Sequence, residues 1–259
     1  MKRFILILLC VACCVPFAFA GGKKLVIGVT PFPHKDLMLV AQKELAKDGY
    51  ELEIREFTDY VQPNMALHSG ALDANFFQHI PYLENMNKQE NLALTWIAKV
   101  HIEPLGLYSK KIKNIKDLKK GDRLAVPNDP TNEARALRLL EKHKVIQIKP
   151  GELVTVQDIT ANPLNLEILE LEAAQLPRVL QDVTAAVINT NFAAEADLVP
   201  ARDAIVIEGK DSPYANVIAV RKADVDIPAI KALAKACNSP AVKEYIEKHL
   251  LEKGIVSGF

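Results

Sequence analysis

The stretch LVIGVTPFPHKDLMLVAQKELAKDGYELEIREF, residues 25–57, decides the fold of this chain. Its first six residues, 25–30, form an apolar run with β-branched side chains, which predicts a strand. Mostly apolar residues then recur at helical spacing from Leu37 onward, and Gly49 is a typical helix stop. Residues 51–57 predict the next strand. A strand, a helix and a strand in this order indicate a mostly parallel sheet with helices on its faces.

The same rhythm continues to the end of the chain. Asp129 is suited to cap a helix that has Pro130 at its first position. The other expected strands lie at 75–77, 92–98, 104–108, 123–127, 166–171, 184–189, 204–207 and 216–221, and the other expected helices at 64–69, 172–182, 228–237 and 240–251. Two α/β units without a long flexible linker predict an α/β protein with two lobes that face a ligand cleft.

The first twenty residues have the pattern of a targeting segment. Lys2 and Arg3 precede an apolar run at 4–19, and the small residues Ala18 and Ala20 resemble a cleavage site. This pattern predicts a signal peptide at 1–20 and therefore an exported protein.

The cysteines leave the form of attachment to a membrane open. Cys10, Cys13 and Cys14 lie inside the apolar run, but the residues before them match a lipidation signal imperfectly. Either one of them carries a lipid, or cleavage follows Ala20. In the second case only Cys237 remains, so no internal disulfide is expected.

Composition and motifs argue against nucleic-acid binding and against several classes of enzyme. The chain has 32 basic and 32 acidic residues, and a lysine-rich segment at 110–120 is interpreted as a solvated face, so no nucleic-acid partner is expected. The sequence lacks the GxSxG, HExxH, GxGxxG and Walker motifs. A cell-envelope enzyme stays open only because catalytic triads assemble from distant residues.

A metal-ion binding protein for zinc or manganese is the other alternative. The first half of the chain contains scattered histidines and carboxylates: His34, His68, His79, His101, Asp36, Asp59, Asp73 and Glu103. Imidazole and carboxylate are ligands of both metals. However, no pair of these histidines has the spacing of a helical metal site.

Residues 73–83 (DANFFQHIPYL) favour a small, partly apolar ligand with a polar head. Phe77 and Tyr82 from this segment, with Tyr60, are candidates for an aromatic wall, although core packing explains each of them equally well. Arg135, in the first turns of the helix that follows Asp129, is the candidate partner of a ligand carboxylate or else a surface ion-pair residue.

Many short stretches in order carry a family resemblance. They are PH (33–34), FTDY (57–60), NFFQH (75–79), PYL (81–83), LYSKK (107–111), VPND (126–129), NEARAL (132–137), LPRVL (176–180), AVIN (186–189) and SPYAN (212–216). With them the chain resembles the methionine-binding lipoprotein family, the NlpA/MetQ-like substrate-binding proteins of bacterial ABC importers, over about 25–250.

The resemblance implies a two-lobed periplasmic-binding fold with mixed, mostly parallel sheets. Lobe 1 would comprise 23–107 plus 212–259, and lobe 2 would comprise 108–211. The function implied is an exported protein of the periplasm or cell envelope that captures methionine, above all L-methionine. It would deliver this ligand to an ABC import permease with ATPase subunits, and a lipid anchor would hold it at the membrane. No catalytic residue, metal or cofactor is implied.

The resemblance also implies which residues face the ligand: Tyr60, Phe77, His79, Tyr82, Arg135, Asn189 and Asn216. The aromatic residues would enclose the thioether chain, with His79 shaping that pocket. Arg135 would pair with the ligand carboxylate, while Asn189 and Asn216 would offer amide groups to its polar head. On this interpretation, replacing Arg135 or Asn216 by Ala abolishes binding and leaves the thermal stability of the empty protein nearly intact.

Overall fold

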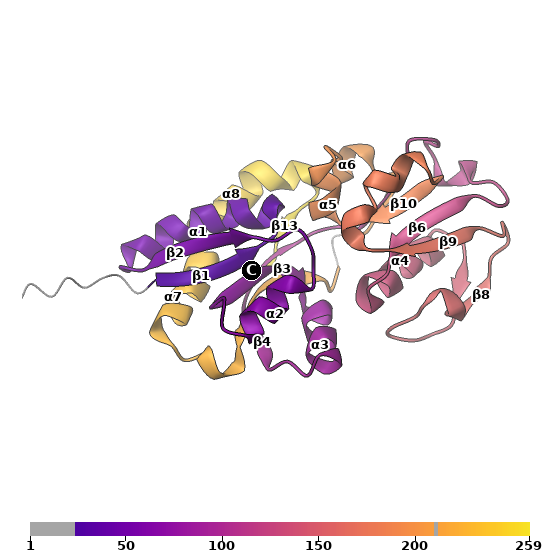
Figure 1. Cartoon of the computed structure of the whole chain (residues 1–259). Helices are drawn as coiled ribbons and strands as arrows, with labels where there is room; N and C mark the ends of the chain where they lie inside the picture. The colour runs from indigo at the N-terminus through magenta and orange to yellow at the C-terminus, as the bar shows by residue number, and fades with distance from the viewer. Residues whose placement is uncertain (1–23, 210–211) are drawn as a thin grey trace, which may run out of the picture.

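The computed structural model describes residues 24–209 and 212–259, which form two β-sheets with helices packed around them (Figure 1). The expected signal peptide at 1–20 lies outside the described residues. No helix in the described part of the chain is long and apolar enough to cross a membrane.

The first sheet has the strand order β13-β4-β12-β3-β1-β2. Its strands are β1 (Lys24–Val29), β2 (Glu51–Glu56), β3 (Ala74–His79), β4 (Leu94–Ile102), β12 (Ala215–Arg221) and β13 (Val256–Ser257). The strand β1 pairs parallel with both β2 and β3, as the βαβ rhythm predicts. The strand β12 pairs antiparallel with β3 and β4, so the sheet is mixed.

Helices cover both faces of this sheet. They are α1 (Asp36–Lys47), α7 (Pro228–Cys237) and α8 (Pro240–Tyr245) on one face, and α2 (Gln62–His68) and α3 (Ile80–Gln89) on the other. Because successive side chains of a strand point to opposite faces, Phe76 packs into the first group while Phe77 packs into the second. Cys237 is fully buried in the first group, where burial raises the pKa of its thiol.

The second sheet has the strand order β11-β5-β10-β6-β9. Its strands are β5 (Gly106–Tyr108), β6 (Arg123–Pro127), β9 (Glu167–Leu171), β10 (Ala185–Ile188) and β11 (Val206–Ile207). The helices α4 (Pro130–Lys142), α5 (Thr190–Glu195) and α6 (Pro200–Asp203) and the small hairpin of β7 (Gln147–Ile148) and β8 (Ile159–Ala161) accompany it. The strands β6, β9 and β10 are parallel, whereas β5 runs antiparallel to β10 and β11.

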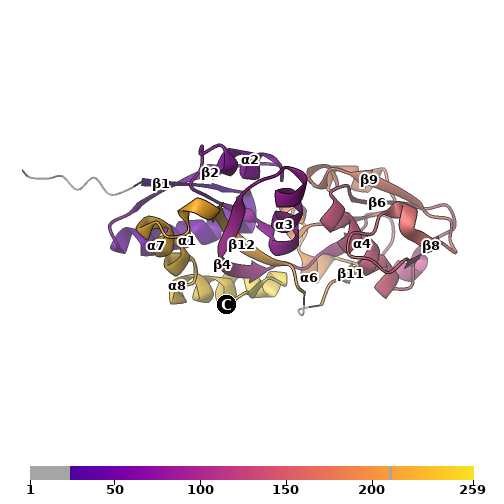
Figure 2. The ribbon, with the colours of Figure 1, turned by 90° about the horizontal axis from the view of Figure 1, so that it is seen from below.

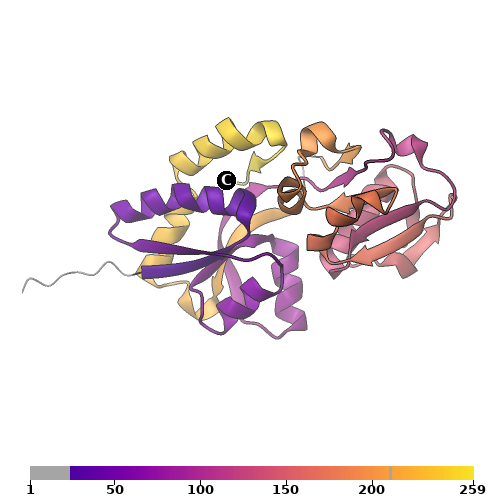
Figure 3. The ribbon, with the colours of Figure 1, turned by 45° about the horizontal axis from the view of Figure 1, so that its top comes forward.

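The chain passes between the two sheets twice. It leaves the first sheet after Ile102 and enters the second at Gly106; it leaves the second after Ile207 and returns at Ala215. Figures 2 and 3 show the two sheets at opposite ends of the molecule, joined by these segments. The lobe boundaries at 107/108 and 211/212 stay predictions, and residue 211 lies outside the described residues.

Several helices differ from the sequence prediction, which also did not include the short helices α5 and α6. The single helix expected at 172–182 is wrong: two short 3₁₀ turns, Ala173–Gln175 and Arg178–Gln181, flank Pro177. A proline has no N–H to donate and its ring clashes with the preceding turn, which prevents a continuous α-helix. The helix expected at 240–251 ends as α8 at Tyr245 and continues as irregular helical turns. The helix α3 was not predicted at all.

We expect Leu37→Ala to destabilise the protein far more than Leu39→Ala, although both lie in α1. The side chain of Leu37 is fully buried against the first sheet, whereas that of Leu39 is 41% exposed. Truncating a buried leucine costs about 2–5 kcal/mol, and exposed substitutions usually cost about 0.5 kcal/mol or less. Urea unfolding of the two variants measures the difference. Equal losses would contradict the packing of α1 described above.

Candidate functional site

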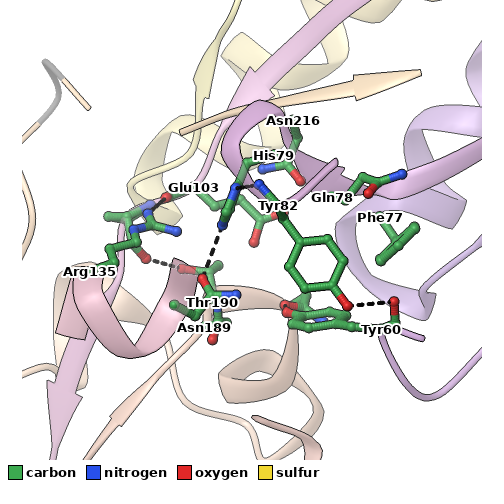
Figure 4. Close-up of a pocket in the computed structure, with 13 residues that line it drawn as sticks. Tyr60, Phe77, Gln78, His79, Tyr82, Glu103, Arg135, Asn189, Thr190 and Asn216 are labelled. Carbon is green, nitrogen blue, oxygen red and sulfur yellow. Dashed lines mark hydrogen bonds between the residues drawn. The ribbon is translucent and has the colours of Figure 1, made fainter. Parts of the chain in front are cut away.

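A pocket between the two sheets brings together all seven residues expected to face a ligand (Figure 4). Its lining comprises Tyr60, Phe77, Gln78, His79, Tyr82, Glu103, Pro104, Asn132, Arg135, Asn189, Thr190, Asn191 and Asn216. His79 ends β3 and Asn189 follows β10 directly. The pocket therefore lies at the carboxyl ends of parallel strands, where α/β sheets commonly bind ligands.

Aromatic rings form one side of the pocket. The ring centroid of Tyr60 lies 5.8 Å from that of Phe77, 5.8 Å from that of Tyr82 and 4.8 Å from that of Phe192. The Tyr82 hydroxyl donates a hydrogen bond to the Tyr60 carbonyl oxygen at 2.9 Å, and the Tyr60 hydroxyl donates to Asn191 Oδ1 at 2.5 Å. Each hydroxyl is thus satisfied, and the ring faces supply an apolar wall.

A directional chain of hydrogen bonds fixes the orientation of two polar side chains. Asp129 caps α4 and accepts hydrogen bonds from Asn132 Nδ2 at 3.1 and 2.9 Å. Asn132 Oδ1 therefore faces away from Asp129 and accepts from Asn189 Nδ2 and His79 Nε2, each at 3.0 Å. His79 Nδ1 accepts from the Tyr82 backbone N–H, which places the imidazole proton on Nε2.

This chain of hydrogen bonds leaves one buried acceptor, Asn189 Oδ1, without a donor among the described residues. Asn189 Nδ2 is used by Asn132, and Asn189 Oδ1 is buried with no hydrogen-bond partner among the described residues. Such a group is costly unless something supplies a hydrogen bond. Burial and the nearby Arg135 lower the pKa of His79 to about 3, so its imidazole is neutral at neutral pH.

Arg135 is buried and already paired. Its Nε and Nη2 donate to the Glu208 carboxylate at 2.8 and 2.5 Å, and Nη2 also donates to the Glu103 carbonyl oxygen at 2.8 Å. The Tyr214 ring centroid lies 4.1 Å from the guanidinium carbon. These contacts leave Nη1 as the nitrogen available to a ligand. Because Glu208 would lose its buried partner, we now expect Arg135→Ala to lower the stability of the empty protein as well as its affinity.

A second cluster lies behind Asn216. His34 Nε2 faces two acceptors, Asn216 Oδ1 at 3.2 Å and Glu103 Oε1 at 3.4 Å, so this nitrogen carries the proton and donates to Asn216 Oδ1. His34 Nδ1 is then the acceptor in the 2.7 Å hydrogen bond with Thr30 Oγ1. The amide nitrogen of Asn216 is thereby left to the pocket. Burial lowers the pKa of His34 to about 4 and that of His101 to about 3, and it raises the pKa of Glu103.

This cluster is also the only group in the described part of the chain with the spacing of a metal site. Ligand atoms of His34, His101 and Glu103 lie within 4.8 Å of one another. His79 belongs to a different hydrogen-bond chain and His68 lies on α2, so only two of the four histidines considered from the sequence gather here. His101 Nε2 lies 2.6 Å from Glu103 Oε1, a hydrogen-bond distance shorter than separate ligands of one zinc ion adopt.

Comparisons with known proteins show the family of the chain. The family model of NlpA lipoproteins matches residues 25–259. The chain belongs to the NlpA lipoprotein family. It is 45% identical to outer membrane lipoprotein 3 of Mannheimia haemolytica, over 85% of each chain. It is 44% identical to the D-methionine-binding lipoprotein MetQ of Escherichia coli K12, over 90% of this chain and 88% of that one.

A solved structure is also similar to this chain in sequence and in fold. A nutrient binding protein from Burkholderia cenocepacia bound to methionine is 50% identical, with a TM-score of 0.88, over 91% of this chain and 100% of that one. This likeness shows the α/β fold of the chain. The family is one of substrate-binding lipoproteins, not of enzymes.

Sequence reasoning missed several residues of the pocket. Glu103 appeared only as a candidate metal ligand, and Asn132, Thr190 and Asn191 were not selected. Asn132 had one usable signal, since it stands three residues after the cap residue Asp129. The position of Glu103 depends on the crossing between sheets, which leaves no local pattern.

We expect Glu208→Ala to lower the free energy of unfolding by about 3 kcal/mol or more, because it leaves the buried guanidinium of Arg135 without its carboxylate. Glu167→Ala is the matched control. Glu167 pairs with Arg123 on the surface, where both side chains are about half exposed and such pairs contribute about 1 kcal/mol or less. Chemical denaturation compares the two. A Glu208 variant as stable as the control would contradict a structural role for the pair.

Proposed function

We propose that this chain is an extracytoplasmic solute-binding protein that captures methionine and delivers it to the permease of an ABC importer, whose ATPase subunits drive uptake. The observation that carries this proposal is the unpartnered, buried Asn189 Oδ1 in the same pocket as Arg135 and an aromatic wall. A zwitterionic amino acid needs an acceptor for its ammonium group, a cation for its carboxylate and an apolar enclosure for its side chain.

The roles follow from the free atoms. Arg135 Nη1 and the amide nitrogen of Asn216 are donors suited to the carboxylate, and Asn189 Oδ1 is an acceptor suited to the ammonium group. Tyr60, Phe77 and Tyr82 would enclose the thioether, which gains about 0.3–1.5 kcal/mol from each good ring contact. His79, held between Asn132 and the Tyr82 backbone, orients the pocket.

Export, attachment to the cell envelope and closure of the lobes are part of the same proposal. Residues 1–20 would direct export, and a lipid would attach the chain to the cell envelope if one of Cys10, Cys13 and Cys14 is modified. The lobes, 23–107 plus 212–259 and 108–211, would close over the ligand by movement at the two crossing segments. Relatives named as methionine-binding lipoproteins support the choice of ligand.

Calorimetric titration of the ligand-free protein tests the proposed function. We expect one equivalent of methionine to bind, and norleucine to bind several-fold more weakly because it lacks the sulfur that contacts the rings. L- and D-methionine are titrated separately to assign the preferred isomer. Binding of zinc or manganese without any response to methionine would replace this proposal with the metal alternative.

We expect Asn189→Ala to weaken methionine binding about ten- to a hundredfold, since a hydrogen bond to a charged group contributes about 1.5–3 kcal/mol. Asn238→Ala is the control. Its side chain donates to the Lys99 carbonyl oxygen at 2.7 Å, outside the pocket lining. Titration of both variants gives the affinity ratio. An Asn189 variant that binds like the control would remove this residue from the site.

A further inference from the structure

Glu103 contacts both Arg135, through its backbone, and the histidine cluster, through its side chain. Its backbone oxygen accepts a hydrogen bond from Arg135 Nη2 at 2.8 Å. Its side-chain Oε1 lies 2.6 Å from His101 Nε2 and 3.4 Å from His34 Nε2. The carboxylate of Glu103 and the guanidinium of Arg135 therefore lie close together. The ammonium and carboxylate of an α-amino acid are close neighbours in the same way, on one carbon atom.

The tautomers of the two histidines direct their protons toward Glu103. The proton of His34 is on Nε2 because this nitrogen faces two acceptors, Asn216 Oδ1 and Glu103 Oε1. His101 Nδ1 is buried without a partner among the described residues, so a proton there would donate to nothing. With its proton on Nε2, His101 donates to Glu103 Oε1. His101 thus binds Oε1, and His34 Nε2 lies 3.4 Å from the same oxygen, so neither imidazole uses Oε2.

The positive charge around Glu103 does not fully balance the negative charge of its carboxylate. The groups that face it are the neutral imidazoles of His34 and His101 and the guanidinium of Arg135, which is shared with the Glu208 carboxylate. Burial raises the pKa values of Tyr60 and Tyr108, and the nearby charge of Glu103 adds to the rise. Burial raises the pKa of Glu103, although His34, Arg135 and the Asn191 backbone N–H oppose the rise.

We propose that the Glu103 carboxylate is the counter-ion of the ligand's ammonium group, that His34 and His101 are positioning residues which hold it, and that binding releases a proton from Glu103. This inference rests on the proposed function. A proton on Glu103 occupies Oε2, because His101 donates to Oε1. The ammonium group competes for that oxygen and displaces the proton. The ligand class is therefore an amino acid with a free α-amine.

The pH dependence has a definite sign. In the empty site the pKa of Glu103 is raised, and an adjacent ammonium ion lowers it in the complex. Between these two values the empty site is protonated and the complex is not, so one proton is released. Affinity is then full above the raised pKa of the empty site and falls as the pH drops through it.

Calorimetry in buffers of different ionisation enthalpy measures the protons released. For the wild-type protein and methionine we expect proton release that grows as the pH is lowered from 8 to 5. Glu103→Gln should release none and bind at least about tenfold more weakly. N-acetylmethionine, which lacks the ammonium group, should bind weakly and show little difference between wild type and Glu103→Gln.

Glu133→Gln is the matched control. Burial raises the pKa of Glu133 to about 7, with Glu170 adding to the rise, and Glu133 does not line the pocket. Its replacement should leave the ligand-linked release unchanged. Methionine binding by the wild type without proton release at any of these pH values would overturn the inference even if Glu103→Gln failed to fold. Absence of methionine binding altogether would instead overturn the proposed function.

Discussion

The pair formed by Arg135 and Glu208 is the contact on which the site depends. Glu208 stands just after β11, where the chain leaves the second sheet, and its Oε2 also accepts the backbone N–H of Leu105 at 3.0 Å, where the chain enters that sheet. One carboxylate therefore ties both crossing segments to the first turns of α4. Because the same guanidinium donates to the Glu103 carbonyl oxygen, the geometry of the pocket and that of the crossings are fixed together.

Buried amides give the pocket its direction. An asparagine side chain presents either an oxygen or a nitrogen to a ligand, and here its neighbours decide which. Asp129 fixes Asn132, and Asn132 then fixes Asn189 with its oxygen toward the pocket. Thr30 fixes His34, and His34 fixes Asn216 with its nitrogen toward the pocket. The orientation of these two amides is thus set by residues that lie two hydrogen bonds away from them.

Much of the fold was predictable because its signals are local. Apolar runs and a proline after an aspartate predict β1, β6 and α4. The sequence did not predict α3, whose core contacts come from few residues, or the break at Pro177. Tyr60, Phe77, Tyr82 and Arg135 were candidates from the residues alone, and the family resemblance supplied the full set of seven pocket residues. Their partners were not predicted, since Arg135 and Glu208 are 73 residues apart and no local pattern connects them.

The position of β12 in the first sheet sets the order in which the molecule can be completed. This strand lies between β3 and β4 but is among the last segments of the chain. All strands of the second sheet, in contrast, come from the continuous span between Gly106 and Ile207. During synthesis or passage through a membrane pore, the second sheet can assemble first. In the first sheet, β3 and β4 each keep an unpaired edge until residues 215–221 arrive and form β12 between them.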